Sequence, residues 1–388
     1  MGSVQSFETP KSRGGRPGKI DAPLNKKLSE VKWGEYRLGD LFEVNSYTKR
    51  FDANKVIVLE DGKYPYVVRM SNNNGQKGYI DENEIYLNEG NTISFGQDTA
   101  TMFYQERPYF TGDKIKILKA KFREFDKSNA QFFLTTMAKS FESFSWGRSS
   151  FRVDIIEKQI ISLPVKGGTI DFDFISSFIA ELEAERIKEL EAHLTVTGLK
   201  DYILTEEEHS VLDSYEDWEW NTFNLEDLFG KSTRGKRLKS ADRIPGELPF
   251  VTAGEADEGI SDFIGNDVAI FSENTTTIDM FGSAKYRNYK YGGDDHVAVV
   301  HTETLHQLAS IFVTSAIHKS SHSGQFDYSK NFYAKDADAL NIQLPSRGGR
   351  PDYECMATFI SAVQKIVIKD VVLFADRKIG MAKEIVNK

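Results

Sequence analysis

The sequence contains an internal duplication, and this feature limits the possible folds more than any other. The phrase from Trp33 to Phe42 returns from Trp220 to Phe229, 187 positions later (220 minus 33), with Trp, Leu and Asp-Leu-Phe in register. The Leu-Pro pair at 163–164 returns at 344–345, after 181 positions (344 minus 163). Matches that keep their order while their spacing drifts so little are typical of a repeated structural unit. We therefore predict two copies of one unit in tandem.

Both copies, at about 33–194 and about 220–388, follow one internal plan. A long first part is rich in Val, Ile, Tyr and Phe and is interrupted by Gly and Asn, a pattern that predicts short strands joined by turns. An apolar patch with helical spacing follows, at 128–141 in the first copy and at 305–319 in the second. The predicted fold class is α+β, with two β-rich globular domains that contain small helices and are separated by two long helices.

Each copy ends in a predicted long helix. The helix follows Leu-Pro and a Gly-Gly turn and has Asp171 or Asp352 in its first turn, where a carboxylate interacts favourably with the helix dipole. Apolar positions then recur at heptad-like spacing, so the two helices, of about 25–30 residues each, are expected to pair antiparallel. The second helix also carries Ile368, Val371 and Val372, which is more apolar surface than one helix covers and predicts contact with another protein.

Charge is distributed unevenly along the chain. The net charge is −9, but residues 181–219 hold thirteen Asp and Glu against three Lys and Arg, so the rest of the chain sums to +1. The part of this stretch that follows the first long helix is predicted to be a charged, partly solvated connector. The predicted segments are a basic, Gly/Pro-rich arm at 1–31, a first globular domain at 32–166, its long helix at 167–195, an acidic linker at 196–218, a second globular domain at 219–347 and its long helix at 348–388.

Composition and motifs point away from catalysis and from a membrane. Cys355 is the only cysteine, which excludes an intrachain disulfide and a cysteine-based zinc site and is typical of a reducing cytoplasm. The sequence has neither an apolar run of roughly 20 residues nor a secretory signal, so we predict a cytoplasmic location. Nucleotide-binding glycine loops, His-Glu-x-x-His and Gly-x-Ser-x-Gly are absent, so we predict that this chain is not an enzyme.

Asp294, Asp295 and His296 form a cluster that could suggest a metal site. The corresponding residues of the first copy, at 112–114, are Gly-Asp-Lys and contain no histidine. A turn that leads into the following strand is the favoured interpretation, and no metal is predicted.

Basic and polar loops are the positive signal for a nucleic acid. The stretch 231–243 has six Lys or Arg in thirteen residues, and the stretch 283–293 interleaves Lys and Arg with Tyr. Lys and Arg neutralise phosphates, while Asn, Gln and Arg pair with base edges. For any single loop an ordinary solvated hairpin tip is the alternative, but the set recurs in both copies and predicts DNA contact. The candidate DNA-binding residues are Asn72, Asn73, Asn74, Gln76, Lys77, Trp146, Arg148, Arg152, Arg234, Lys236, Arg237, Lys285, Arg287 and Lys290.

Two units that each open with Trp and Leu-x-Asp-Leu-Phe, and that each close on Leu-Pro before a long helix, identify a family. Over residues 32–388 the chain resembles the specificity (S) subunits of Type I and BcgI-like Type IIB restriction–modification enzymes. The two long helices are short for this family, and the N-terminal arm is long and basic. Both features favour the BcgI-like or a compact Type I form. The apolar and Trp residues of the repeated phrase are expected to be structural.

The resemblance implies a function and a set of partners. Each globular domain would read one half of a bipartite site in double-stranded DNA, and the two helices would set the spacing between the half-sites. The helices would also dock methyltransferase subunits, two being expected, with restriction or translocation subunits as further candidates. S-adenosylmethionine would bind to the methyltransferase, and this chain would hold no cofactor. The alternative is a stand-alone DNA-binding or regulatory protein without a methyltransferase partner.

Overall fold

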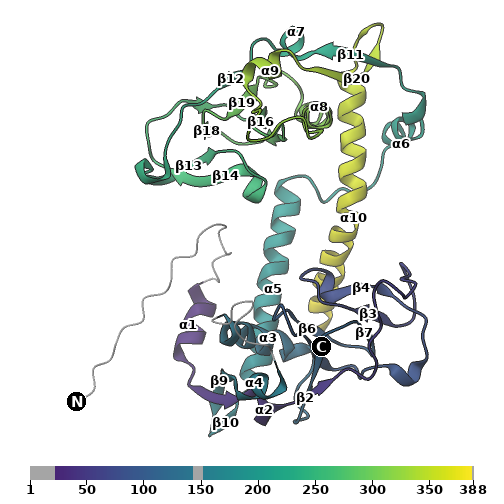
Figure 1. The fold of residues 1–388 in the computed structure, drawn as a ribbon, viewed down its shortest axis with the longest axis vertical. Helices are drawn as coiled ribbons and strands as arrows, with labels where there is room; N and C mark the ends of the chain where they lie inside the picture. Colours follow the sequence, from purple (N-terminus) through teal and green to yellow (C-terminus); the bar gives the residue numbers. More distant parts are fainter. Residues whose placement is uncertain (1–21, 143–151, 387–388) are drawn as a thin grey trace. The chain divides into compact units, whose positions relative to one another are not determined.

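The computed structural model describes residues 22–142 and 152–386 (Figure 1). The chain forms two compact units, an N-terminal unit that covers 19–189 and a C-terminal unit that begins at Leu190, within the first long helix. No helix in the described ranges is long and apolar enough to cross a membrane.

The N-terminal unit contains three small sheets, with strand orders β1-β9-β10, β2-β8-β5-β6 and β4-β3-β7. Short 3₁₀ helices are labelled η. In chain order the elements are α1 (Ala22–Glu30), β1 (Trp33–Arg37), α2 (Leu38–Leu41), β2 (Phe42–Ser46), β3 (Pro65–Val67), η1 (Asn73–Gly75), β4 (Gln76–Tyr79), η2 (Glu84–Tyr86), β5 (Thr92–Gly96), β6 (Met102–Gln105), β7 (Phe110–Thr111), β8 (Ile115–Ala120), α3 (Lys127–Phe141), α4 (Val153–Lys158), β9 (Ile160–Lys166), β10 (Thr169–Ile170) and α5 (Phe172–Val196).

The C-terminal unit also contains three small sheets, with strand orders β11-β20-β21, β12-β19-β16-β17 and β14-β13-β18-β15. Its elements are α6 (Glu206–Asp213), η3 (Tyr215–Asp217), β11 (Trp220–Asn224), α7 (Leu225–Phe229), β12 (Thr233–Arg234), η4 (Ser240–Asp242), β13 (Pro245–Val251), η5 (Ala256–Gly259), β14 (Ile260–Ile264), β15 (Ile270–Phe271), β16 (Thr275–Asp279), β17 (Ala284–Arg287), β18 (Tyr291–Gly293), β19 (Val297–Val300), α8 (Gln307–Ser321), α9 (Ala334–Asp338), β20 (Asn341–Arg347), β21 (Arg350–Pro351) and α10 (Tyr353–Val386).

The strand pairing repeats from one unit to the other. The strand that carries the first tryptophan pairs antiparallel with the strand that carries Leu-Pro in both units, as β1 with β9 and as β11 with β20. A fully buried central strand, β5 or β16, lies between two antiparallel neighbours. A short parallel pair, β3 with β7 or β13 with β18, also occurs in each unit. The predicted duplication and the α+β class are therefore confirmed.

The repeated phrase contributes to both cores, but unequally. Leu41 and Phe42 are buried in the N-terminal unit, whereas Leu228 and Phe229 are half-buried at the edge of the other core. Trp33 and Trp220 remain 45% and 38% exposed. Each ring stacks on a phenylalanine of the helical patch, Phe132 or Phe312, with ring centroids 6.2 and 6.3 Å apart. The expected structural role of the phrase thus holds, although both tryptophans lie at the surface.

A short helix precedes the first strand of each unit, and each of these helices lies within a segment for which no helix was predicted. α1 lies within the predicted arm 1–31, buries Leu24 in the core of the N-terminal unit and contacts α5 through the ion pair of Lys27 with Glu181. α6 lies within the predicted linker 196–218, where the carboxylate of Glu208 accepts hydrogen bonds from Ser361 at 2.6 Å and from Lys365 at 3.0 Å on α10. The middle of the acidic segment therefore forms a capped helix with a buried charge pair, and the role of the segment as a connector stays a prediction.

The end of α5, from Leu190 on, packs against α10 within the C-terminal unit. Leu194, Val372 and Ala375 are buried there, with Leu190 and Ile368 half-buried beside them. Val372 is only 1% exposed, which corrects its assignment to a surface for another protein. Packing of the two helices along their whole length stays a prediction.

Candidate DNA interface

In the N-terminal unit the predicted amide run forms the loop between β3 and β4. The backbone N–H of Val68 donates to the carbonyl of Gly75 at 2.8 Å and closes the loop. Asn73 and Asn74 adopt left-handed backbone conformations (φ 47° and 53°), and Gly75 follows with φ 73°. Asn is one of the few residues that tolerate this region, because its short polar side chain bonds locally.

The side chains of the loop are divided between holding it and facing solvent. Asn73 donates through Nδ2 to the carbonyl of Gln76 at 2.8 Å, and Asn74 donates to the carbonyl of Tyr104 at 3.1 Å. Asn72, Asn73, Asn74 and Lys77 are exposed, and Gln76 is half-buried. Trp146 and Arg148 lie outside the described residues. Arg152 is exposed at the start of α4 and forms an ion pair with Asp154 at 3.2 Å.

In the C-terminal unit, β12 and the loop after it present cations to solvent. Arg234, Lys236 and Arg237 are exposed, and none of them forms an ion pair with any residue in the described ranges. A β-carbon added at Gly235 would lie 1.6 Å from the carbonyl oxygen of Gly293. The loop is therefore pressed against the end of β18, an approach that glycine alone permits.

Two of the predicted contacts in β17 are corrected by their burial. Arg287 is 1% exposed and donates to Thr277 Oγ1 at 2.9 Å, to the Tyr289 hydroxyl at 2.8 Å and to the Glu258 carbonyl at 2.8 Å.

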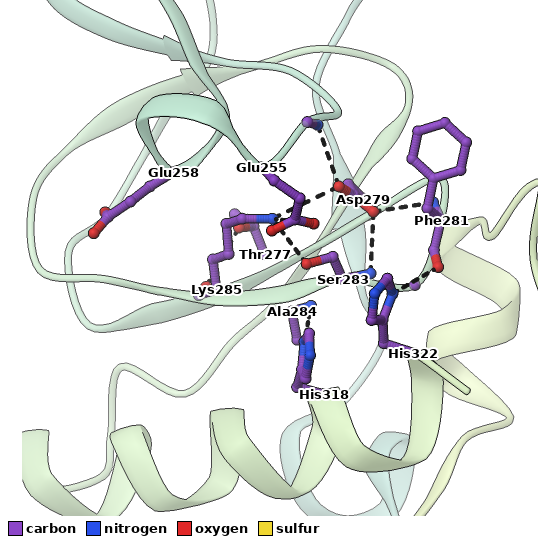
Figure 2. Close-up of polar contacts among 12 residues, drawn as sticks. Glu255, Glu258, Thr277, Asp279, Phe281, Ser283, Ala284, Lys285, His318 and His322 are labelled. Atoms are coloured by element: carbon purple, nitrogen blue, oxygen red, sulfur yellow. Dashed lines mark hydrogen bonds and ion pairs between the residues drawn. The ribbon is translucent and has the colours of Figure 1, made fainter. Parts of the chain in front are cut away.

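Lys285 has a side chain that is only 15% exposed. Its ammonium lies 3.7 Å from the Asp279 carboxylate and donates to Ser283 at 2.9 Å and to Glu255 at 3.3 Å (Figure 2). Both cations therefore bind groups of the protein itself. They occupy alternate positions of β17, and alternate residues of a strand in a buried sheet face inward. Lys290, beyond the strand, is exposed.

Two loops of the C-terminal unit lie at one side of a sheet. β13 and β18 are parallel neighbours, with Val251 opposite Gly293, so the segments that follow them leave from the same side. The loop 252–259 follows β13, and the basic loop 235–239 lies against Gly293. We call this side the open edge.

The open edge of the N-terminal unit is built in the same way but has a different charge pattern. β3 and β7 are parallel, and the loop 68–75 follows β3. A pocket at this edge is lined by Arg50, Arg69 and Asp113, among others. Arg50 pairs with Asp113 at 3.4 Å, and Arg69 and Lys114 both pair with Asp98. The cations here are largely matched by carboxylates.

A threonine–tyrosine pair supports each open edge from inside. Thr92 and the Tyr109 hydroxyl are 3.1 Å apart, and Thr275 and the Tyr291 hydroxyl are 2.9 Å apart. Burial raises the pKa of both tyrosines well above the ordinary range, so both phenols stay protonated.

Asp294, Asp295 and His296 form a turn before β19, as predicted. Their ligand atoms lie within 4.8 Å of one another, and burial raises the pKa of Asp294. All three are half-buried, and the N–H of Asp294 bonds to the Val251 carbonyl. The cluster is thus part of the scaffold of the open edge.

Comparison with known proteins agrees with this duplicated architecture. The model of the family "Type I restriction modification DNA specificity domain" matches twice, at 30–192 and at 216–366. The chain belongs to this family of DNA specificity domains. A specificity subunit, S.BcgI, of a Type II restriction enzyme from Heyndrickxia coagulans is 27% identical over 347 residues, covering 87% of this chain and 96% of that protein. The crystal structure of a Type I restriction–modification S subunit from M. genitalium has a TM-score of 0.55 at 15% identity, covering 92% of this chain and 94% of that one.

The family assignment confirms the predicted resemblance to specificity subunits. Each matched region contains one open edge. Sequence reasoning missed the loop 252–259, which corresponds to the amide loop 68–75. Counting 184 positions on from the first loop (248 minus 64, from YPYV to LPFV) would have found it.

Proposed function

We propose that this chain is the DNA-specificity subunit of a restriction–modification complex, and that each unit reads one half of a bipartite site in double-stranded DNA. One observation carries the proposal. A complete specificity domain is repeated, and its two copies keep the same open edge while presenting different exposed side chains there. Two chemistries on one scaffold fit two different half-sites.

The contacts divide between phosphates and bases. Arg234, Lys236, Arg237 and Lys290 are exposed and suit phosphate contacts in the C-terminal unit. In the N-terminal unit the amides of the loop 68–75 suit base edges, with Lys77, Trp146, Arg148 and Arg152 also proposed as DNA contacts.

The partners are proposed to be methyltransferase subunits, two of them because the duplication offers two related docking sites. α10 exposes Ile366, Val367, Val371 and Phe374, a concentration of apolar side chains that favours contact with another protein. The methyltransferase would bind S-adenosylmethionine and transfer the methyl group. The length of the long helices in this chain would set the position of the methyltransferase along the DNA.

Single-molecule sequencing of host DNA, with the gene present and deleted, tests the specificity role. We expect a split motif with a fixed gap to lose its base methylation in the deletion strain. An unchanged methylation map, with a methyltransferase shown to be expressed, would contradict the proposal.

Co-purification tests the docking face. The double variant V371D/F374D should lose the methyltransferase, because it places two charges in an apolar contact. The matched control is V196D at an exposed position of α5, which should retain it. Equal recovery with both variants would place the docking surface elsewhere.

A further inference from the structure

The two hairpin loops of the open edges, 68–75 and 252–259, have the same backbone. In each, the first residue donates its N–H to the carbonyl of the last residue at 2.8 Å, Val68 to Gly75 and Thr252 to Gly259. A bulge in the strand pair precedes both loops. The loops therefore have equal length and equal closure, although they share no residue except the final glycine.

Both loops end in three consecutive left-handed residues. The φ angles are 47°, 53° and 73° at 73–75, and 48°, 55° and 80° at 257–259. A left-handed conformation costs roughly 1–2 kcal/mol for most non-glycine residues such as Glu258, and less for Asn and Asp, whose short polar side chains bond locally. Two such residues in a row, kept in both units with different side chains, indicate that the backbone shape itself is required. Strain of this kind concentrates at ligand-contacting sites.

A buried side chain holds each turn from beneath, and it occupies the same sheet position in both units. Gln105 lies opposite Thr92, and Arg287 lies opposite Thr275. Gln105 donates to the carbonyl of Asn74 at 3.1 Å, and Arg287 donates to the carbonyl of Glu258 at 2.8 Å.

Each of these side chains also binds a hydroxyl on the central strand. Gln105 bonds to Ser94 at 3.0 Å, and Arg287 bonds to Thr277 at 2.9 Å. This explains why a predicted DNA-contact arginine is buried: it fixes a loop and does not reach solvent.

The loop of the C-terminal unit has a second anchor. Asp279 is buried and accepts hydrogen bonds from the backbone N–H groups of Gly254, Phe281 and Ser283 (Figure 2). Figure 2 also shows the carboxylate of Glu258 pointing away from this network. Asp257 and Glu258 are exposed, and their carboxylates bond to no side chain in the described ranges.

The charge of the buried side chain beneath each turn complements the charge of the loop tip. Neutral Gln105 lies under the Asn73–Asn74 tip, while cationic Arg287 lies under the Asp257–Glu258 tip. Arg287 forms no ion pair with a described residue, and its guanidinium is 6.0 and 5.9 Å from the rings of Tyr289 and Tyr291. The positive charge below partly offsets the repulsion between the acidic tip and a phosphate backbone.

We propose that the loops 68–75 and 252–259 are matched base-reading elements, and that positions 73–74 and 257–258 determine the specificity of the two half-sites. This rests on the proposed function. Asp257 and Glu258 accept hydrogen bonds from an exocyclic base amine in the major groove, with cytosine N4 as the amine that carboxylates suit. Asn73 and Asn74 each keep an amide oxygen and one amide N–H without a hydrogen bond in the described ranges, and this acceptor–donor pair suits N6 and N7 of adenine. Gln105 and Arg287 are positioning residues that hold the reading turns.

The test is the methylation motif directed by variants of the full chain in its complex. The double variant D257N/E258Q keeps the size of the tip but adds donors and removes both charges. We expect at least about a tenfold loss of methylation at the original half-site and a changed base preference at one or two adjacent positions. The other half-site should not change. N73D/N74E should produce the mirror result, and D267N, at an exposed carboxylate of the same unit, should leave both half-sites unchanged.

A second set of variants tests the positioning role. R287Q should relax the base preference of one half-site, and adding D257N/E258N should restore a sharp preference, now for a different base. R287K keeps the positive charge but cannot bond to both the Glu258 carbonyl and Thr277. It should therefore also lose the original base preference. A general loss of folding would affect both half-sites equally and would leave the triple variant inactive.

Failure of the proposed function and failure of the base-reading role of the loops give different results. If the unmodified complex directs no split motif, the proposed function itself fails. If it directs a split motif that D257N/E258Q and N73D/N74E both leave unchanged, the loops do not read bases and only this inference is overturned. Loss of methyltransferase co-purification in D257N/E258Q, with the motif intact, would instead make the loop a docking surface and would overturn the inference as well.

Discussion

The open edges of the two units show how one backbone can carry two chemistries. In the N-terminal unit the tip is uncharged, a neutral Gln105 holds it, and the nearby Arg50 and Arg69 are paired with carboxylates. In the C-terminal unit the tip is acidic, Arg287 holds it, and Lys236 is exposed without an ion pair in the described ranges. The scaffold therefore fixes the position of each loop, while the loop and its buried anchor differ together between the units.

The largest effect is expected from the buried anchors. R287A removes the three hydrogen bonds of a fully buried side chain and leaves the carbonyl of Glu258 without its donor, so we expect the C-terminal unit to lose about 3 kcal/mol of unfolding free energy. Q105A, at the same position of the other unit, removes a neutral group and should destabilise its unit by only about 1–2 kcal/mol. Chemical denaturation followed by hydrogen exchange in each unit measures both. R237A, which truncates an exposed side chain, is the control, and equal losses for R287A and Q105A would remove the asymmetry between the anchors.

The short helices that open the units offer a second contrast. Glu208 and Lys365 form a buried pair between α6 and α10, with side chains 6% and 15% exposed. The corresponding pair in the N-terminal unit, Lys27 with Glu181 between α1 and α5, is largely exposed. E208Q should therefore lower the unfolding free energy by about 2 kcal/mol, whereas E181Q should have no measurable effect.

The Glu208 contribution should also depend on pH. Burial alone raises the pKa of Glu208, but hydrogen bonds from Ser361, from the Thr205 backbone and from Lys365 outweigh burial and lower it. A carboxyl whose folded pKa is lowered stabilises the protein above its unfolded pKa, roughly 4.3 for glutamate, and the stabilisation disappears as pH falls through the folded value. Denaturation curves of the unmodified protein and E208Q should therefore approach each other as pH falls below about 4.3, and a constant gap between them would contradict this account.

A smaller effect is expected on DNA affinity. K236A/R237A removes two exposed cations and should weaken DNA binding about tenfold while lowering the slope of log K against log salt by about 2. R50A/R69A should change the slope less, because carboxylates already neutralise both side chains. Titration at several salt concentrations gives the slopes, with the exposed Lys335 changed to Ala as the control. A larger slope change in R50A/R69A would mean that the ion pairs of the N-terminal unit open on DNA.

The duplication, the fold class and the two long helices could be predicted because order, spacing and apolar periodicity survive in the sequence. The short helices could not, since α1 and α6 share no side-chain pattern and Glu208 looks like any solvated charge until Lys365 is beside it. The burial of Arg287 could not be predicted either. An Arg among tyrosines is typical of a DNA contact, and only the pairing of β16 with β17 shows that its side chain faces inward.

The repeated tryptophan gives the smallest and most local contrast. Trp33 stacks on Phe132 in the N-terminal unit. Trp220 stacks on Phe312 and also lies against Trp218 and Tyr215, with ring centroids 5.8 and 6.1 Å away.

An aromatic pair contributes about 0.5–1.5 kcal/mol beyond area burial, so W220A should destabilise its unit by about 1 kcal/mol more than W33A destabilises its own. Thermal unfolding of the two variants measures this difference, and W220F should recover part of the loss because it keeps an aromatic ring. Equal losses would show that the two added aromatic neighbours contribute nothing, so that the repeated tryptophan stabilises both units to the same extent.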